Sequence, residues 1–137
     1  MVQQKQIIKT VLEHYPEVQA IYLFGTYGTD DQWTESDVDI ALLLKHQQAK
    51  AVGTLVMSDL RFELERLLKK DVDLINLRLV PTVLQKEIIA ANRRIYTADK
   101  YAADEFDMLT ISYYQKLNEE RAEILEEIMT SGRVVQP

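Results

Sequence analysis

The chain has 137 residues, a length that suits one domain with its own hydrophobic core, and its formal net charge of −6 argues against an extended nucleic-acid-binding face. It contains no cysteine, which excludes disulfides and thiolate metal sites, and its two histidines, His14 and His46, argue against a zinc site. Since no apolar run approaches the roughly 20 residues of a membrane-spanning helix and polar residues interrupt the N-terminal stretch, we expect a cytoplasmic protein without a signal peptide.

The first third of the chain predicts a helix followed by two buried strands. Apolar residues recur at helical spacing within residues 3–14, and Pro16 ends that helix. Ala20–Phe24 is rich in β-forming residues, and Gly25 ends this strand with a tight turn that leads into a polar surface loop. Val38–Leu44 is then an apolar run interrupted only by one acid, as expected for a strand covered on both faces.

The middle of the chain predicts helices alternating with a third strand. Apolar residues recur every three or four positions across 47–69, which predicts one long helix with Gly53 as its weak point. Val72–Leu77 predicts the third strand. Pro81 fits the first position of the next helix, whose inner face would be formed by Leu84, Ile88 and Ala91.

The C-terminal part predicts a short edge strand over Arg94–Thr97 and a long helix over Lys100–Thr130, ended by Gly132. One face of this helix carries Phe106, Leu109, Tyr113, Leu117, Ile124 and Ile128. Together these elements predict an α/β (α+β) protein with a small mixed sheet backed by helices. We expect residues 1–98 to form its core and residues 99–137 a C-terminal helical arm of the same single domain.

Two aspartates stand at the start of the second strand, Asp37 and Asp39, separated by Val38. Positions two apart in a strand share a face, so the two carboxylates would lie side by side while Val38 turns to the core. Neighbouring carboxylates raise each other's pKa unless a cation lies between them, and Mg²⁺ binds through one or two carboxylates together with substrate phosphates. The pair therefore predicts a metal site for a phosphorylated ligand.

The spacing G-[ST]-x10-D-x-D is met by Gly25, Thr26, Asp37 and Asp39, and it resembles the signature of nucleotidyltransferases with the DNA polymerase β palm fold. The family usually carries serine where this chain has Thr26, which keeps the hydroxyl. The arginine or glycine that often follows shortly afterwards is absent here. The resemblance implies a polymerase β palm-like fold and nucleotidyl transfer from a nucleoside triphosphate.

The third strand supplies a further acid, from either Asp71 or Asp73. The family places its third acid before a hydrophobic pair, which favours Asp73 and leaves Asp71 as the alternative. By this hypothesis Asp37 and Asp39 bridge two Mg²⁺ ions, while Asp73 holds the ion that activates the attacking hydroxyl and also accepts its proton.

The nucleotide would be received at Gly25 and Thr26. A turn that leads into a short helix aims backbone N–H groups at an anion, Gly25 lets a phosphate come close, and the Thr26 hydroxyl adds a hydrogen bond. Tyr27 and Trp33 flank this turn and are candidates for stacking on the base, although Trp33 equally suits an exposed loop.

Other polar side chains fit simpler interpretations. The cationic side chains Arg61, Arg66, Lys69 and Lys70 could reach a phosphate, but such a cluster is usually the solvated face of a helix. His46 is interpreted as a solvated loop residue and Tyr113 as a core residue, while Tyr114 is undecided.

Within the superfamily the chain is most similar to the minimal nucleotidyltransferases (MNT), and among them to the MntA-type antitoxins paired with HEPN-domain ribonuclease toxins. The similarity is carried by residues 21–25, 36–40, 71–74, 77–78, 82–84 and 110–115. It implies AMPylation, in which AMP passes from ATP to a tyrosine hydroxyl of the cognate HEPN toxin, with Mg²⁺ as cofactor and with neither nucleic acid nor membrane as a direct partner.

Two other functions stay open at this point. A non-catalytic antitoxin would neutralise the toxin by binding alone, through the long C-terminal helix and the acidic surface. A nucleotidyltransferase acting on a small cationic molecule, such as an aminoglycoside, would need an acidic pocket, for which Asp30, Asp31 and Glu35 are candidates.

Overall fold

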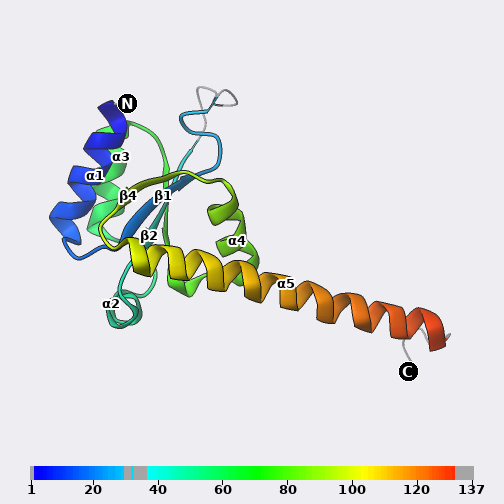
Figure 1. Ribbon diagram of the computed structural model, residues 1–137. Helices are drawn as coiled ribbons and strands as arrows, with labels where there is room; N and C mark the ends of the chain where they lie inside the picture. The colour runs from blue at the N-terminus through cyan, green and yellow to red at the C-terminus, as the bar shows by residue number, and fades with distance from the viewer. Residues whose placement is uncertain (1, 30–31, 33–36, 132–137) are drawn as a thin grey trace.

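The computed structural model describes residues 2–29, 32 and 37–131, and it places a four-stranded sheet between helices (Figure 1). The elements in chain order are α1 (Val2–His14), β1 (Ala20–Phe24), β2 (Val38–Leu43), α2 (His46–Val52), α3 (Asp59–Leu68), β3 (Val72–Asn76), the 3-10 turn η1 (Leu77–Leu79), α4 (Thr82–Ala90), β4 (Arg94–Thr97) and α5 (Lys100–Ser131). None of the described helices has the length and apolar composition needed to cross a membrane.

The sheet is mixed, as the sequence predicts, with strand order β3-β2-β1-β4. β1 pairs antiparallel with β2 and β4, whereas β2 pairs parallel with β3. The register sets Asp39 opposite Phe24 on one side and opposite Asp73 on the other. The start of β2 therefore lies between the end of β1 and the start of β3.

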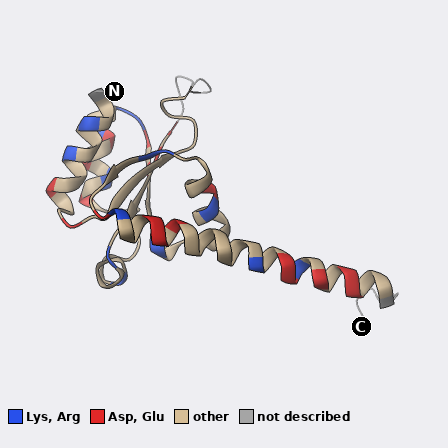
Figure 2. Cartoon of the chain, in the orientation of Figure 1, with Lys and Arg blue, Asp and Glu red and all other residues tan. Residues whose placement is uncertain are grey.

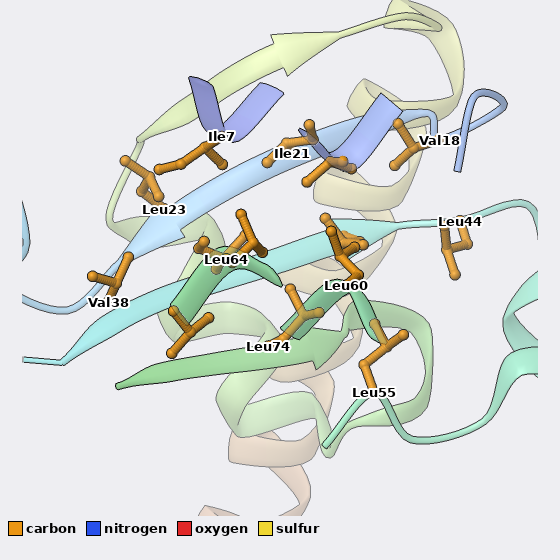
Figure 3. Packing of buried hydrophobic residues seen from close by; sticks show 14 of the residues in the cluster. Ile7, Val18, Ile21, Leu23, Val38, Leu44, Leu55, Leu60, Leu64 and Leu74 are labelled. Atoms are coloured by element: carbon orange, nitrogen blue, oxygen red, sulfur yellow. The ribbon is translucent and has the colours of Figure 1, made fainter. Parts of the chain in front are cut away.

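Alternating side chains of the strands feed two separate hydrophobic clusters. On one face Ile21, Leu23 and Leu74 pack with residues of α1 and α3, as Figure 3 shows. On the other face Tyr22 and Leu43 pack with residues of α4 and α5. Because β2 is covered on both faces, all of its residues except Asp39 are buried, which confirms the prediction of a doubly covered strand.

The predicted helix over 47–69 is wrong, because the structure divides it into α2 and α3. Gly53 has φ 66° and ψ −143°, a backbone conformation that is open essentially only to glycine. Ser58 then begins the second helix by accepting a hydrogen bond from the Arg61 N–H. Val56 lies in this break and is 51% exposed, although the periodicity placed it on the buried stripe.

The next helix also departs from the expected boundaries. Pro81 is the N-cap of α4 and not its first helical residue, and Ala91 lies exposed just past the helix end. Leu84 and Ile88 do face inward, as predicted.

The long C-terminal helix α5 is confirmed, but its predicted apolar face is covered only near its start. Ala103 and Thr110 are buried against the body of the protein, whereas Leu109 and Tyr113 are more than half exposed. From residue 118 to residue 130 every side chain is exposed, and the helix extends beyond the sheet (Figure 1). The interpretation of Tyr113 as a core residue is therefore wrong.

Candidate active site

The three predicted acids meet at one edge of the sheet. Asp39 of β2 is directly opposite Asp73 of β3, and Asp37 immediately precedes β2. The intervening Val38 is fully buried, so the alternation of the strand turns the apolar side chain to the core and the flanking carboxylates away from it. Asp37 and Asp73 are exposed, and Asp39 is half-buried between them.

The carboxyl of Asp39 is the electrostatic centre of this group. Burial raises its pKa, and the charges of Asp73 and Asp37 raise it further. Among the described residues, no three His, Asp or Glu side chains already stand in the arrangement of a metal site. The three aspartates thus repel one another electrostatically but do not surround a common point. A hard divalent cation is the chemical species that would offset their charges.

Gly25 brings the turn after β1 into contact with these acids. Its φ is 70°, and a Cβ placed on it would lie 2.1 Å from the Asp39 Oδ2 atom. Glycine is therefore required here both by backbone conformation and by space. The close approach puts the backbone of the predicted phosphate turn beside the predicted metal ligands.

Residues 26–29 form a hydrogen-bonded turn and not the short helix that the sequence analysis assumed. The Thr29 N–H and the Thr29 hydroxyl both donate to the Thr26 carbonyl, at 3.0 and 2.6 Å. The Gly28 N–H donates to the Gln32 side chain at 2.6 Å. The N–H groups of Gly28 and Thr29 are therefore bonded within this segment, and no helix dipole stands behind the turn.

Of the two aromatic candidates for base stacking, the structure contradicts Tyr27, and the prediction for Trp33 stays untested. Tyr27 is only 5% exposed and belongs to the hydrophobic core, where burial raises the pKa of its phenol. Trp33 lies outside the described residues, as do Asp30, Asp31 and Glu35.

A cavity of about 370 Å³ opens on the β3 side of the acids. It is lined by Asp37, Val56, Arg61, Asp71, Val72, Asp73 and Leu74. Arg61 was interpreted as part of a solvated helix face, but its guanidinium donates to the carbonyls of Val72 and Val56, each at 2.9 Å. Its neighbours in that cluster, Arg66 and Lys69, are exposed.

Arg93 is a residue of this region that the sequence analysis missed. Its guanidinium donates to the carbonyls of Gly25 and Tyr27, so it lies directly against the turn beside Asp39. No local pattern points to it, because 66 or more positions separate it from its partners in the chain.

His46 and Tyr114 lie away from these acids. His46, exposed at the start of α2, shares a 3.1 Å hydrogen bond with Arg78 near the far end of β2. Tyr114 is half-buried on α5 beneath the Lys86 ammonium group, 5.1 Å from the ring centre.

Comparison with known proteins identifies the class to which this fold and this cluster of acids correspond. Residues 6–101 match the family described as polymerase beta, nucleotidyltransferase, and the chain belongs to that family. The chain is 34% identical over 129 residues to the protein adenylyltransferase MntA of Shewanella oneidensis. The matched region covers 93% of this chain and 88% of that protein.

Solved structures of similar chains come from toxin–antitoxin pairs. A chain of a toxin–antitoxin with AMP-PNP superposes with a TM-score of 0.71 at 32% identity, covering 92% of this chain and 98% of that chain. A chain from the tri-AMPylated Shewanella oneidensis HEPN toxin in complex with MNT antitoxin gives 0.67 at 31% identity, covering 93% and 97%. The predicted polymerase β-like nucleotidyltransferase fold is thus confirmed.

Proposed function

We propose that this protein is an antitoxin that transfers AMP from ATP to a tyrosine hydroxyl of a partner HEPN ribonuclease and thereby neutralises it. The observation that carries the proposal is the meeting of Asp37, Asp39 and Asp73 beside the Gly25 turn, in a chain of the nucleotidyltransferase family. Two comparisons support a toxin as the acceptor: the chain is similar to a protein adenylyltransferase and to a chain solved with a tri-AMPylated HEPN toxin.

The donor set suits magnesium. Carboxylate oxygens are the ligands that Mg²⁺ takes from proteins, and burial together with the charges of Asp73 and Asp37 raises the pKa of Asp39, a repulsion that a divalent cation would offset. Asp37 and Asp39 would hold two ions, and Asp73 would help to hold the ion that activates the acceptor hydroxyl. When bound, these ions supply charge neutralisation at the triphosphate and favour ionisation of the acceptor hydroxyl.

The order of the strands supports an in-line reaction. The Gly25 turn lies on the β1 side of the aspartates, and the cavity with Asp73 lies on the β3 side. Nucleotidyl transfer requires the attacking oxygen and the leaving group on opposite sides of the phosphorus. The polyphosphate would therefore rest on the Gly25 turn while the phenol approaches through the cavity.

With this arrangement, the transfer of AMP needs no reactant other than ATP and the phenol. The phenolic oxygen forms a bond to the α-phosphorus of ATP, the bond from that phosphorus to pyrophosphate breaks, and the phenolic proton passes to Asp73. A phenol with a pKa of about 10 is a weak nucleophile at neutral pH, so this proton acceptor lowers the barrier.

The proposal is tested with purified protein, ATP, Mg²⁺ and the partner toxin, by following the toxin's mass. The toxin should gain AMP with the wild-type protein, and Asp37→Asn, Asp39→Asn and Asp73→Asn should each reduce the rate by about 1,000-fold, as loss of several kcal/mol of metal-borne stabilisation implies. Asp71→Asn tests the alternative third acid, because Asp71 lines the same cavity two residues before Asp73. A toxin of unchanged mass after incubation with folded wild-type protein would contradict the proposal. A larger loss of rate in Asp71→Asn than in Asp73→Asn would assign the role of third acid to Asp71.

A non-catalytic antitoxin is the second candidate, and the exposed apolar residues of α5 favour it. Leu109, Ile111, Ile124 and Leu125 are each more than 40% exposed in the chain alone. Apolar residues gathered along one helix are typical of a binding surface. An Asp37→Asn/Asp39→Asn double variant that still protects cells from the toxin would support neutralisation by binding, whereas loss of protection supports AMP transfer.

A further inference from the structure

The backbone around Arg93 directs this side chain at the turn that follows β1. After α4 ends, Asn92 adopts the left-handed conformation with φ 55°, and its N–H bonds the Ile89 carbonyl at 3.0 Å. The chain then runs beside β1, where the Leu23 N–H donates to the Arg93 carbonyl at 2.9 Å. Arg93 is thereby fixed next to the last residues of β1, within reach of the Gly25 turn.

The Arg93 guanidinium holds two carbonyls of that turn with one rigid group. One terminal nitrogen donates to the Gly25 carbonyl at 3.3 Å, and the other donates to the Tyr27 carbonyl. A guanidinium presents its N–H groups in a planar fork, so two simultaneous bonds fix orientation as well as distance. The peptide planes that follow Gly25 and Tyr27 are therefore both restrained by Arg93.

Restraining a carbonyl also restrains the N–H group of the same peptide. In a trans peptide the C=O of one residue and the N–H of the next point in opposite directions. With the Gly25 carbonyl turned to Arg93, the Thr26 N–H is turned away from Arg93. The Gly28 N–H shows the same relation, since the Tyr27 carbonyl bonds Arg93 while this N–H donates to Gln32 on the other side.

The charge of Arg93 differs from that of its neighbour Arg94. Arg94 forms ion pairs with Asp104 and Asp107, each at 2.9 Å, and so ties β4 to α5. Arg93 forms no ion pair with a carboxylate of the described residues; it is half-buried, and burial lowers its pKa. A guanidinium stays charged at neutral pH, so Arg93 places a positive charge on the turn beside Asp39, and its hydrogen-bond partners among the described residues are carbonyls.

We propose that Arg93 is a positioning residue for the nucleotide, which holds the Gly25 and Tyr27 carbonyls so that the backbone of the turn beside Asp39 is preset to receive the polyphosphate. The inference rests on the proposed nucleotidyl transfer and adds a residue from outside its sequence motif. Its positive charge also favours a polyanion at this side of the aspartates.

The experiment compares the wild-type protein with Arg93→Gln, Arg93→Lys and the matched control Arg94→Gln. Binding of AMP-PNP with Mg²⁺ is measured by calorimetry and Tm by thermal unfolding, both without and then with the partner toxin. The ATP KM and kcat are measured by AMP transfer to the toxin. Arg93→Gln should weaken AMP-PNP binding and raise the ATP KM by about tenfold, because it removes charged hydrogen bonds that order the turn. Arg93→Lys should fall between, since lysine keeps the charge but cannot hold two carbonyls in a fork.

Arg94→Gln should lower Tm while leaving AMP-PNP binding within about twofold of the wild type, because its partners lie on α5. If Arg93→Gln does not fold, Arg93→Lys carries the comparison at a temperature where both it and the wild type are folded. AMP-PNP binding and ATP KM equal to the wild type in the folded Arg93 variants would overturn the positioning role. Failure of the wild type itself to bind AMP-PNP with Mg²⁺ would instead overturn the proposed function.

Discussion

At the scale of single residues, two glycines with similar positive φ values allow the effect of backbone strain to be separated from an effect on catalysis. Gly25 and Gly53 have φ values of 70° and 66°, yet a Cβ on Gly25 would meet the Asp39 carboxylate whereas a Cβ on Gly53 would have nothing within 4 Å. Any other residue at either position is strained by about 1–3 kcal/mol. Only at Gly25 does the new side chain also displace a proposed metal ligand.

Gly25→Ala should therefore lower the rate of AMP transfer by about 100-fold or more, the effect expected of misplacing a catalytic group by an ångström. Gly53→Ala should lose comparable stability in chemical denaturation while keeping the transfer rate within a few-fold of the wild type. Equal transfer rates in the two variants would show that Asp39 can move aside without consequence, which would argue against its role as a ligand.

Asp39 also gives a prediction about the metal-free protein. Since burial and the neighbouring acids raise the pKa of Asp39, the folded protein binds this proton more tightly than the unfolded chain does. The associated stability is present below the unfolded value of about 3.9 and is lost as pH rises through the higher folded pKa. At neutral pH and without a cation, the carboxyl of Asp39 therefore contributes less stability than it does in acid.

Accordingly, Asp39→Asn should have a higher Tm than the wild type in EDTA at pH 7, and the difference should shrink below about pH 4, where Asp39 is protonated. Addition of Mg²⁺ should raise the Tm of the wild type but not that of Asp39→Asn. Thermal unfolding with and without the metal checks both statements, and a wild-type protein more stable than Asp39→Asn in EDTA would contradict the repulsion.

At the scale of elements, periodicity predicts which segments fold and which strands are buried, but it does not predict where the chain breaks. The apolar spacing continues through 53–58, so it indicates one helix where Gly53 and Ser58 separate two. The acids at the start of β2 and β3 could be predicted because they follow strand alternation and a known motif. Arg93 could not, because its partners are remote in sequence and are brought near only by the pairing of β4 with β1.

The apolar face of α5 shows a second limit of periodicity. The spacing of Leu109, Tyr113 and Ile124 correctly predicts a helix with one apolar face, yet these residues are exposed in the isolated chain. Periodicity reports that a face favours burial, but it does not report whether the covering surface belongs to the same chain. A helix whose apolar side is covered by a partner has the same sequence pattern as one covered by its own core.

The start of α5 is held to the sheet by a polar network that should respond to acid. Arg94 pairs with Asp104 and Asp107, and the Tyr22 hydroxyl donates to Asp107 at 2.7 Å. Hydrogen bonds from Lys100 and then from Arg94 lower the pKa of Asp104. A depressed folded pKa contributes stability above the unfolded value of about 3.9, and this contribution is lost as pH falls through the folded pKa.

We therefore expect the Tm of the wild type to begin falling below about pH 4, with part of that dependence removed in Asp104→Asn. Glu120→Gln is the matched control, because Glu120 is exposed on the distal part of α5. Thermal unfolding across a series of acidic buffers measures the effect. Parallel curves for the wild type and Asp104→Asn would mean that this ion pair contributes nothing to docking of the helix.

At the scale of the whole molecule, the candidate catalytic residues and the start of α5 lie at opposite ends of β1. Ala20, at the end of β1 remote from Gly25, pairs with Thr97, so α5 starts near that remote end. The helix then passes the body and continues outward, with residues 118–130 all exposed (Figure 1). At 1.5 Å per residue, this distal part adds about 20 Å of helix beyond the body.

The chemistry of that distal helix fits the proposed toxin. It carries exposed apolar side chains among acidic ones, and Figure 2 shows acidic groups along it. The residues concerned are Ile124, Leu125, Ile128 and Met129, together with Glu119, Glu120, Glu123, Glu126 and Glu127. A ribonuclease attracts polyanionic RNA with a basic surface, and an acidic helix with an apolar stripe is complementary to such a surface.

Removal of residues 118–137 should therefore separate docking from chemistry. Residues 118–130 are all exposed, so Tm should change by no more than about 3 °C, and AMP-PNP binding should stay as in the full chain. AMP transfer to the folded toxin should lose about tenfold or more in the KM for the toxin while kcat changes little, because lost docking contacts weaken binding of the acceptor and not the transfer step. Titration of the toxin at saturating ATP measures both constants. Ile124→Ser with Leu125→Ser should reproduce the rise in KM, whereas an unchanged KM in the truncated protein would place the acceptor's docking surface on the body of the protein.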